Sequence, residues 1–146
     1  MSKTTAFETD FLELVFTNTD LAGIGDGTGL QGSGTPGSLY ICLFTGNPDE
    51  AGSIANECVY TGYARVGVAR SGAGWTVSGD TVSNAAAVTF GECTAGSETA
   101  THFGIAKADA ESTADLIFYG ALDSGLAISS GIIPEFIIGA IDVTEQ

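Results

Sequence analysis

Short apolar runs separated by glycine, serine, threonine and asparagine fill the chain from residue 39 onward. Runs bounded by turn-forming residues and spaced about ten residues apart are typical of the strands of a sandwich or barrel. The 21 glycines suit tight turns between such strands. The sequence therefore predicts an all-β fold, namely an antiparallel β-sandwich or jelly-roll-like domain. The predicted strands are residues 39–45, 63–71, 75–78, 86–90, 101–106, 116–122 and 137–143, with shorter pieces at 126–128 and 132–133.

Two of these strands are apolar on both faces. Elsewhere, Ala64, Val66 and Val68 alternate with the residues at 65, 67 and 69, as expected of a strand with one buried face and one face toward solvent. Residues 39–44 and 116–119 do not alternate. A second layer must therefore cover them, and we expect it to be the amino-terminal helix or another copy of the chain.

One short helix is predicted before the strands. Thr5 and Glu8 have the spacing of a capping box, so the helix should begin there, and it should end near Asn18. Leu12 and Phe16 make its apolar face wider than a lone surface helix needs, which indicates docking on the sheet or contact with a neighbouring subunit. The main apolar stripe consists of Phe7, Phe11, Leu14 and Val15, with acidic residues such as Glu8 mostly on the other face or in the first turn.

A glycine-rich segment, residues 19–38, follows the helix. Gly27, Gly29 and Gly32 satisfy the dinucleotide-binding spacing, but no strand precedes them, no helix follows and no lysine is near. We therefore expect a loop or subunit-wrapping arm and no nucleotide. The predicted organisation is a single domain with a helix at 1–18, this arm at 19–38 and a β-sandwich at 39–146.

Charge excludes several classes of partner. Four basic residues stand against 18 acidic ones, which gives a formal net charge of -14. Binding DNA, RNA or an anionic membrane requires clustered lysine and arginine, so we expect neither nucleic acid nor membrane as a partner. No apolar stretch approaches the roughly 20 residues of a spanning helix, and no secretory signal is expected, because acidic residues follow Lys3 closely.

Reactive side chains are few and scattered. Cys42, Cys58 and Cys93 show no CxxC spacing, and we expect them to be reduced and structural. His102 is the only histidine; a nucleophilic pair with Cys93 is formally conceivable, but it lacks a third group to position it. The sequence therefore predicts no catalytic residue, no metal site and no cofactor.

The acidic residues leave one question open at this point. Asp49 with Glu50, or Asp109 with Glu111 and Asp115, have the chemistry for acid and base work on a glycan, and sequence alone does not say which of them meet in space. A calcium site is the milder alternative, although the alternating pattern of an EF-hand loop is absent. We expect these carboxylates to be solvated loop residues.

Seven blocks in fixed order resemble a bacteriophage virion family whose members usually carry the label "phage tail fiber protein". The resemblance covers nearly the whole chain, although the 19–38 insertion and residues 91–96 depart from the family pattern. It implies a small β-sandwich structural protein without catalytic residues. The blocks are residues 11–16, 39–45, 62–65, 82–84, 88–90, 101–105 and 116–122.

The resemblance also implies where such a protein acts. We expect a virion component, made in the host bacterial cytoplasm, that decorates and stabilises the assembled capsid as a homotrimer bound to the major capsid protein. The alternative is a tail fibre or minor tail protein that contacts tail proteins and the host through Tyr60, Tyr63 and Trp75. The candidate interface residues are Phe7, Phe11, Leu12, Phe16, Ile24, Leu30 and Trp75.

Overall fold

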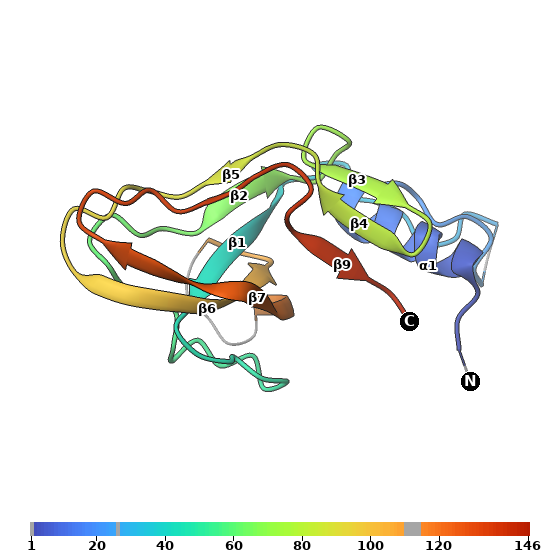
Figure 1. Ribbon diagram of the computed structural model, residues 1–146. Helices are drawn as coiled ribbons and strands as arrows, with labels where there is room; N and C mark the ends of the chain where they lie inside the picture. The colour runs from blue at the N-terminus through green and yellow to red at the C-terminus, as the bar shows by residue number, and fades with distance from the viewer. Residues whose placement is uncertain (1, 26, 110–114) are drawn as a thin grey trace. The chain divides into compact units, whose positions relative to one another are not determined.

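The structure of the chain is a computed structural model that describes residues 2–25, 27–109 and 115–146. It is mostly β, with antiparallel strand pairs and one short amino-terminal helix, which confirms the predicted fold class (Figure 1). The elements are α1 (Thr5–Leu12), a π-helical turn (Glu13–Thr17), β1 (Ser38–Phe44), β2 (Val66–Ala69), β3 (Trp75–Ser78), β4 (Thr81–Asn84), β5 (Val88–Thr89), β6 (Ser97–Ala106), β7 (Leu116–Ser129), β8 (Glu135–Phe136) and β9 (Asp142–Thr144).

The chain forms two compact units. The first contains residues 1–38, 68–87 and 136–146, and the second contains residues 39–67 and 88–135. The strands form a four-stranded sheet in the order β2-β1-β6-β7, a three-stranded sheet β3-β4-β9 and a two-stranded sheet β5-β8. One segment boundary of these units falls between residues 38 and 39, and the predicted division into helix, arm and sandwich stays a prediction.

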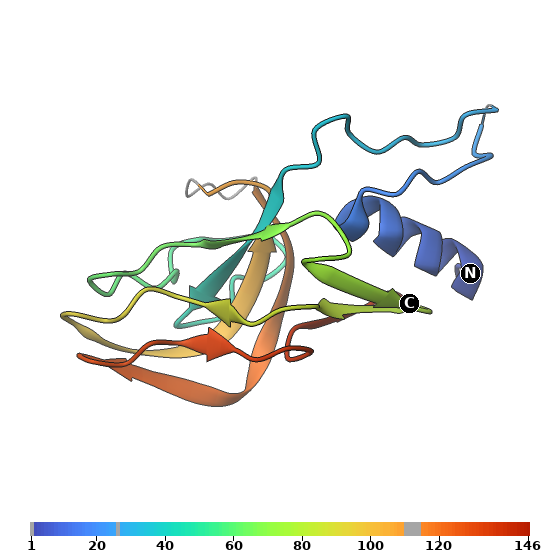
Figure 2. The same ribbon diagram turned by 90° about the horizontal axis from the view of Figure 1, so that it is seen from above.

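In the first unit, α1 lies along the sheet β3-β4-β9 (Figure 2). Thr4 caps the helix, because its hydroxyl accepts a hydrogen bond from the Phe7 amide. The cap was therefore predicted one residue too late, since two adjacent threonines offer the same chemistry. The helix ends at Asn18, as predicted, where the backbone enters the left-handed region.

The buried face of this helix differs from the predicted stripe. Leu12 and Phe16 are fully buried and Glu8 is nearly so, whereas Phe7 and Phe11 are only half-buried. These buried positions are four residues apart, and the π-helical turn holds Phe16 edge-on against Trp75, with ring centroids 4.8 Å apart. A wider turn at the end of the helix changes which residues face the sheet, and the 3.6-residue period of an α-helix does not predict such a turn.

The glycine-rich segment is pinned to its own unit. Leu21 and Leu30 exchange two backbone hydrogen bonds of 2.8 and 2.9 Å, and the Asn18 amide both donates to and accepts from Ser33. Arg70 donates to the Pro36 carbonyl at 3.2 Å. The segment therefore folds back on itself as a narrow loop whose base is held at several points.

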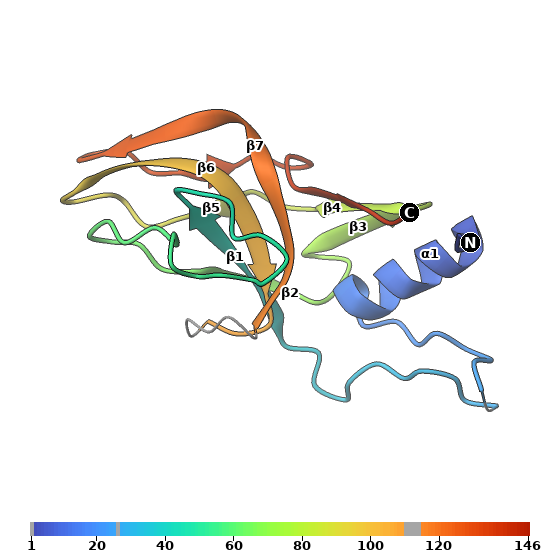
Figure 3. The ribbon, with the colours of Figure 1, turned by 90° about the horizontal axis from the view of Figure 1, so that it is seen from below.

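In the second unit, β6 runs antiparallel between β1 and β7 (Figure 3). Ile41, Cys42, Leu43 and Phe44 of β1 are fully buried, so the chain itself covers both faces of this strand. On β7, in contrast, Ile117 and Tyr119 remain 37% and 41% exposed. The second apolar run was thus predicted correctly as a strand but is not covered within the chain.

Several strand boundaries differ from the prediction. β4 was missed because Thr81 and Ser83 are polar, although Val82 and Asn84 point inward and are buried. β7 extends past its predicted end and absorbs residues 126–128, whereas residues 132–133 form no strand. The predicted strand 137–143 was also wrong in its first half, because a turn at Gly139, with φ 73, precedes β9.

Candidate interaction surface

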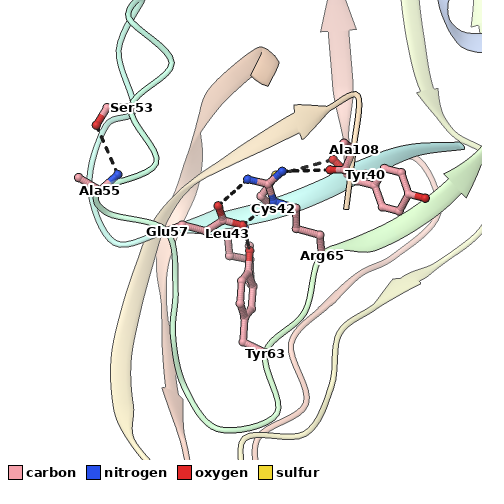
Figure 4. Close-up of polar contacts among 9 residues, drawn as sticks. All are labelled: Tyr40, Cys42, Leu43, Ser53, Ala55, Glu57, Tyr63, Arg65 and Ala108. Atoms are coloured by element: carbon pink, nitrogen blue, oxygen red, sulfur yellow. Dashed lines mark hydrogen bonds and ion pairs between the residues drawn. The ribbon is translucent and has the colours of Figure 1, made fainter. Parts of the chain in front are cut away.

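A buried ion pair organises the loops of the second unit (Figure 4). Arg65 donates two hydrogen bonds to the Glu57 carboxylate, from Nε at 2.8 Å and from Nη2 at 2.7 Å, and both side chains are only 2% exposed. The segment that carries Glu57 is held against β1, because the Cys58 amide donates to the Leu43 carbonyl at 2.9 Å. Backbone pairing therefore brings the carboxylate to the guanidinium.

Further hydrogen bonds complete this network. The Tyr63 hydroxyl donates to Glu57 Oε1 at 2.8 Å and accepts from the Leu43 amide at 3.1 Å, while Arg65 Nη1 donates to the Ala108 carbonyl at 3.0 Å. The hydrogen bonds to Glu57 raise the pKa of Arg65, and burial followed by the Glu57 charge raises the pKa of Tyr63. Arginine thus stays charged and tyrosine stays protonated at neutral pH. The ion pair at the centre of the network is closed to solvent, and the network holds the surrounding segments together.

A second carboxylate holds the neighbouring loop. Both Glu98 oxygens accept from the Val59 amide at 3.1 Å, and one accepts from the Tyr60 amide at 3.2 Å. The Val59 side chain projects from this loop and is 75% exposed. Tyr60 itself is buried, and its ring contacts Tyr63 edge-on at 5.4 Å.

The basic side chains are largely used inside the chain. Arg70 donates to the carbonyls of Val15 and Leu14, each at 2.7 Å, at the end of the helical segment. Lys3 pairs with Glu145 at 2.8 Å. With Arg65 buried as well, Lys107 is the one basic residue for which the described structure gives no side-chain bond, and it is exposed. Most of the charge that the surface presents is therefore negative.

The two most exposed isoleucines are Ile137 and Ile138, at 68% and 67%. They lie in the turn just before β9, which is closed by the Ala140 amide donating to the Ile137 carbonyl at 3.1 Å. Sequence reasoning missed them by assigning this run to a strand; the signal that could have found them is Gly139, a turn residue directly after them. The other exposed large apolar residues are Ile24, Leu30, Val59, Ile117, Tyr119, Ile132 and Ile133.

The predicted interface residues divide into two groups. Leu12, Phe16 and Trp75 are buried within the first unit and present no surface to a partner. The structure leaves Phe7 and Phe11 half-buried, Ile24 37% exposed and Leu30 47% exposed. Burial also removes Tyr60 and Trp75 from the predicted host-contact residues. Whether the exposed members bind anything stays a prediction.

The candidate reactive groups are mostly structural in the described residues. All three cysteines are free and buried, as predicted, and burial raises the pKa of both Cys42 and Cys58 to about 12. The Cys93 thiol points to the Ala95 carbonyl at 3.4 Å, and His102 Nδ1 contacts the hydroxyl of Thr101 at 2.9 Å. Cys93 and His102 are not linked to each other by any of these contacts.

Those of the carboxylates considered from the sequence that the structure describes lie outside the strands. Asp49 accepts from the Ala51 amide within its own turn, and Glu50 and Asp109 are exposed. Glu111 lies outside the described residues. Within residues 2–25, 27–109 and 115–146, no three histidine, cysteine, aspartate or glutamate side chains cluster to hold a metal ion. Over the same part of the chain, no helix has the length and apolar character needed to cross a membrane.

The chain matches a known protein family. Residues 27–144 match the family model described as Gp80, podophage GP4 fiber I protein gp80. No curated protein matches the chain. The matched span includes every strand from β1 to β9 and most of the glycine-rich loop.

Proposed function

The chain belongs to the podophage fiber I protein family and is a structural protein of the phage virion, and from that premise we propose that it is a non-enzymatic part of the tail fibre. The family match confirms the resemblance predicted from the sequence. It also favours the tail alternative over capsid decoration, which was the first expectation from the sequence. The family match is the single observation that carries the proposal. Capsid decoration is the second candidate, because the matched family model is described as a fiber protein.

The distribution of side chains supports a binding role. Polar groups capable of chemistry, such as Glu57 and Arg65, are engaged with each other in the interior. Large apolar side chains lie at the surface instead, on β7 and in the turn before β9. Clustered exposed apolar residues mark surfaces that bind other proteins. The expected partners are other tail proteins, and the self-association predicted from the sequence, as a homotrimer, would use Ile117 and Tyr119 of β7.

Copy number and location test the proposal. Quantitative mass spectrometry of washed virions, with immunogold labelling, should find a small number of copies per particle on the tail. Hundreds of copies on the head would support decoration instead, and absence from infectious particles would refute both. Light scattering after size exclusion tests the trimer separately: a monomer at every concentration would remove self-association in solution from the proposal.

A further inference from the structure

Two adjacent isoleucines stand out on the first unit because they are exposed and rigidly held. Ile137 and Ile138 keep about two-thirds of their surface in water, at 68% and 67%. Exposed isoleucine side chains do not stabilise the fold. They stabilise a complex when a partner removes them from water. The turn that carries them is therefore the most prominent apolar point of this unit.

Asn84 fixes the turn from inside. Its side chain is almost completely buried; Nδ2 donates to the Ile137 carbonyl at 2.9 Å, and Oδ1 accepts from the Ile141 amide at 2.9 Å. Its own carbonyl accepts from the Gly139 amide at 3.0 Å. A turn held at three backbone positions loses little conformational entropy on binding, which is the usual property of a preorganised binding residue.

Charge indicates the partner. Lys3 and Arg70 are the only basic residues in the first unit, and both are bonded internally, to Glu145 and to backbone carbonyls. Asp142 directly follows the turn region and is exposed. The ranges of the first unit contain eight acidic residues against these two basic ones, so an apolar turn on this unit is complementary to an apolar pocket bordered by lysine or arginine. A second copy of this chain is a poor source of such a border, because Lys3, Arg65 and Arg70 are engaged within the chain and Lys107 alone remains exposed without a described side-chain bond.

We infer that the Asn84-braced turn is a docking point, in which Ile137 and Ile138 enter an apolar pocket with a basic rim on a different virion protein. This inference rests on the proposed virion role and adds the binding residues and the chemistry of the partner. It assigns the docking contact to a preformed turn and leaves β7 for contacts between copies.

The test uses phage that carry an amber mutation in the gene of this chain. Grown on a non-suppressing host, they give particles that lack the protein, to which purified wild-type or variant chain is added. The double variant Ile137→Ser with Ile138→Ser should lower the affinity for these particles by at least about tenfold. Val59→Ser, which removes a side chain that is 75% exposed on the second unit, is the matched control and should change affinity less than about twofold.

Salt and solution state complete the experiment. Raising NaCl from about 0.05 M to about 0.5 M should slow association, because a basic rim attracts the acidic chain only while the charges are unscreened. Equal binding of the double variant, or an association rate that ignores salt, would overturn the inference. So would a wild-type oligomer that dissociates in the double variant, since the occupant would then be a second copy. A chain absent from wild-type virions would instead refute the proposed function.

Discussion

Removing Arg65 should destabilise the second unit strongly, because the change leaves the buried Glu57 carboxylate without its charged partner. In Arg65→Met the methionine fills most of the volume, but Glu57 loses two hydrogen bonds of 2.7 and 2.8 Å and keeps only the donation from Tyr63. Breaking a buried pair from one side costs about 3–5 kcal/mol. With an urea m-value of about 2 kcal/mol/M, this loss lowers the unfolding midpoint by about 2 M.

A double variant separates the unpaired charge from the loss of the pair. Glu57→Met combined with Arg65→Met removes both charges, so we expect it to lie within about 1–2 kcal/mol of wild type, the residual cost being the Tyr63 hydroxyl that loses its acceptor. Lys107→Met is the matched control, because it removes an exposed positive charge. It should change the free energy of unfolding by less than about 0.5 kcal/mol.

Urea unfolding followed by far-ultraviolet circular dichroism measures these differences. Fluorescence of Trp75, the only tryptophan, follows the first unit in the same samples. Two results would refute the reasoning: a loss below about 1 kcal/mol in Arg65→Met, or a double variant as unstable as that single variant. Either would mean that water or rearrangement compensates Glu57 when its partner is removed.

Three further predictions concern other parts of the chain. Burial raises the pKa of Cys42 and Cys58 to about 12, whereas a thiol of the unfolded chain ionises at about pH 8.5. The urea midpoint should therefore be constant below about pH 8.5 and should fall as the pH rises from there to about 12, because only the unfolded chain ionises in this range. Ellman's reagent should label both thiols only after unfolding. Arg70→Met should speed proteolysis within residues 19–38 by releasing the Pro36 carbonyl, and it should lower the urea midpoint because the carbonyls of Val15 and Leu14 lose their donor as well; a proteolysis rate equal to that of the wild type would contradict the role of Arg70 in holding the loop. Gly62→Ala should cost at least about 1 kcal/mol in urea unfolding, because φ is 107 there and a Cβ would clash with a neighbouring backbone carbonyl; a neutral result would exclude this backbone strain.

Local signals were sufficient for much of the fold. β1 was predicted nearly to the residue and β3 to both ends, because each is a short run rich in apolar or β-branched residues between turn residues. The free, buried cysteines and the termination of the helix at Asn18 also followed from sequence. Each of these features depends on neighbours within a few positions, which is the range over which propensity and periodicity carry information.

Features that depend on distant parts of the chain were not predictable in the same way. Glu8 is buried because of the sheet on which the helix packs, and β4 is a strand because β3 and β9 pair with it on both sides. The Glu57–Arg65 pair depends on irregular segments that have no period to read. The apolar run that contains Ile137 and Ile138 predicts a strand, but hydrogen bonds from the distant Asn84 hold these residues in a turn.

The π-helical turn at Glu13–Thr17 also limits how the chain can change in length. Each residue of an α-helix advances the side-chain direction by about 100°, so a one-residue deletion here would rotate Phe16 away from Trp75. The neighbouring loop has no such constraint at Gly23 and Gly34, where space is open around the backbone. Relatives should therefore accumulate insertions and deletions in that loop and conserve the residue count of the helical turn.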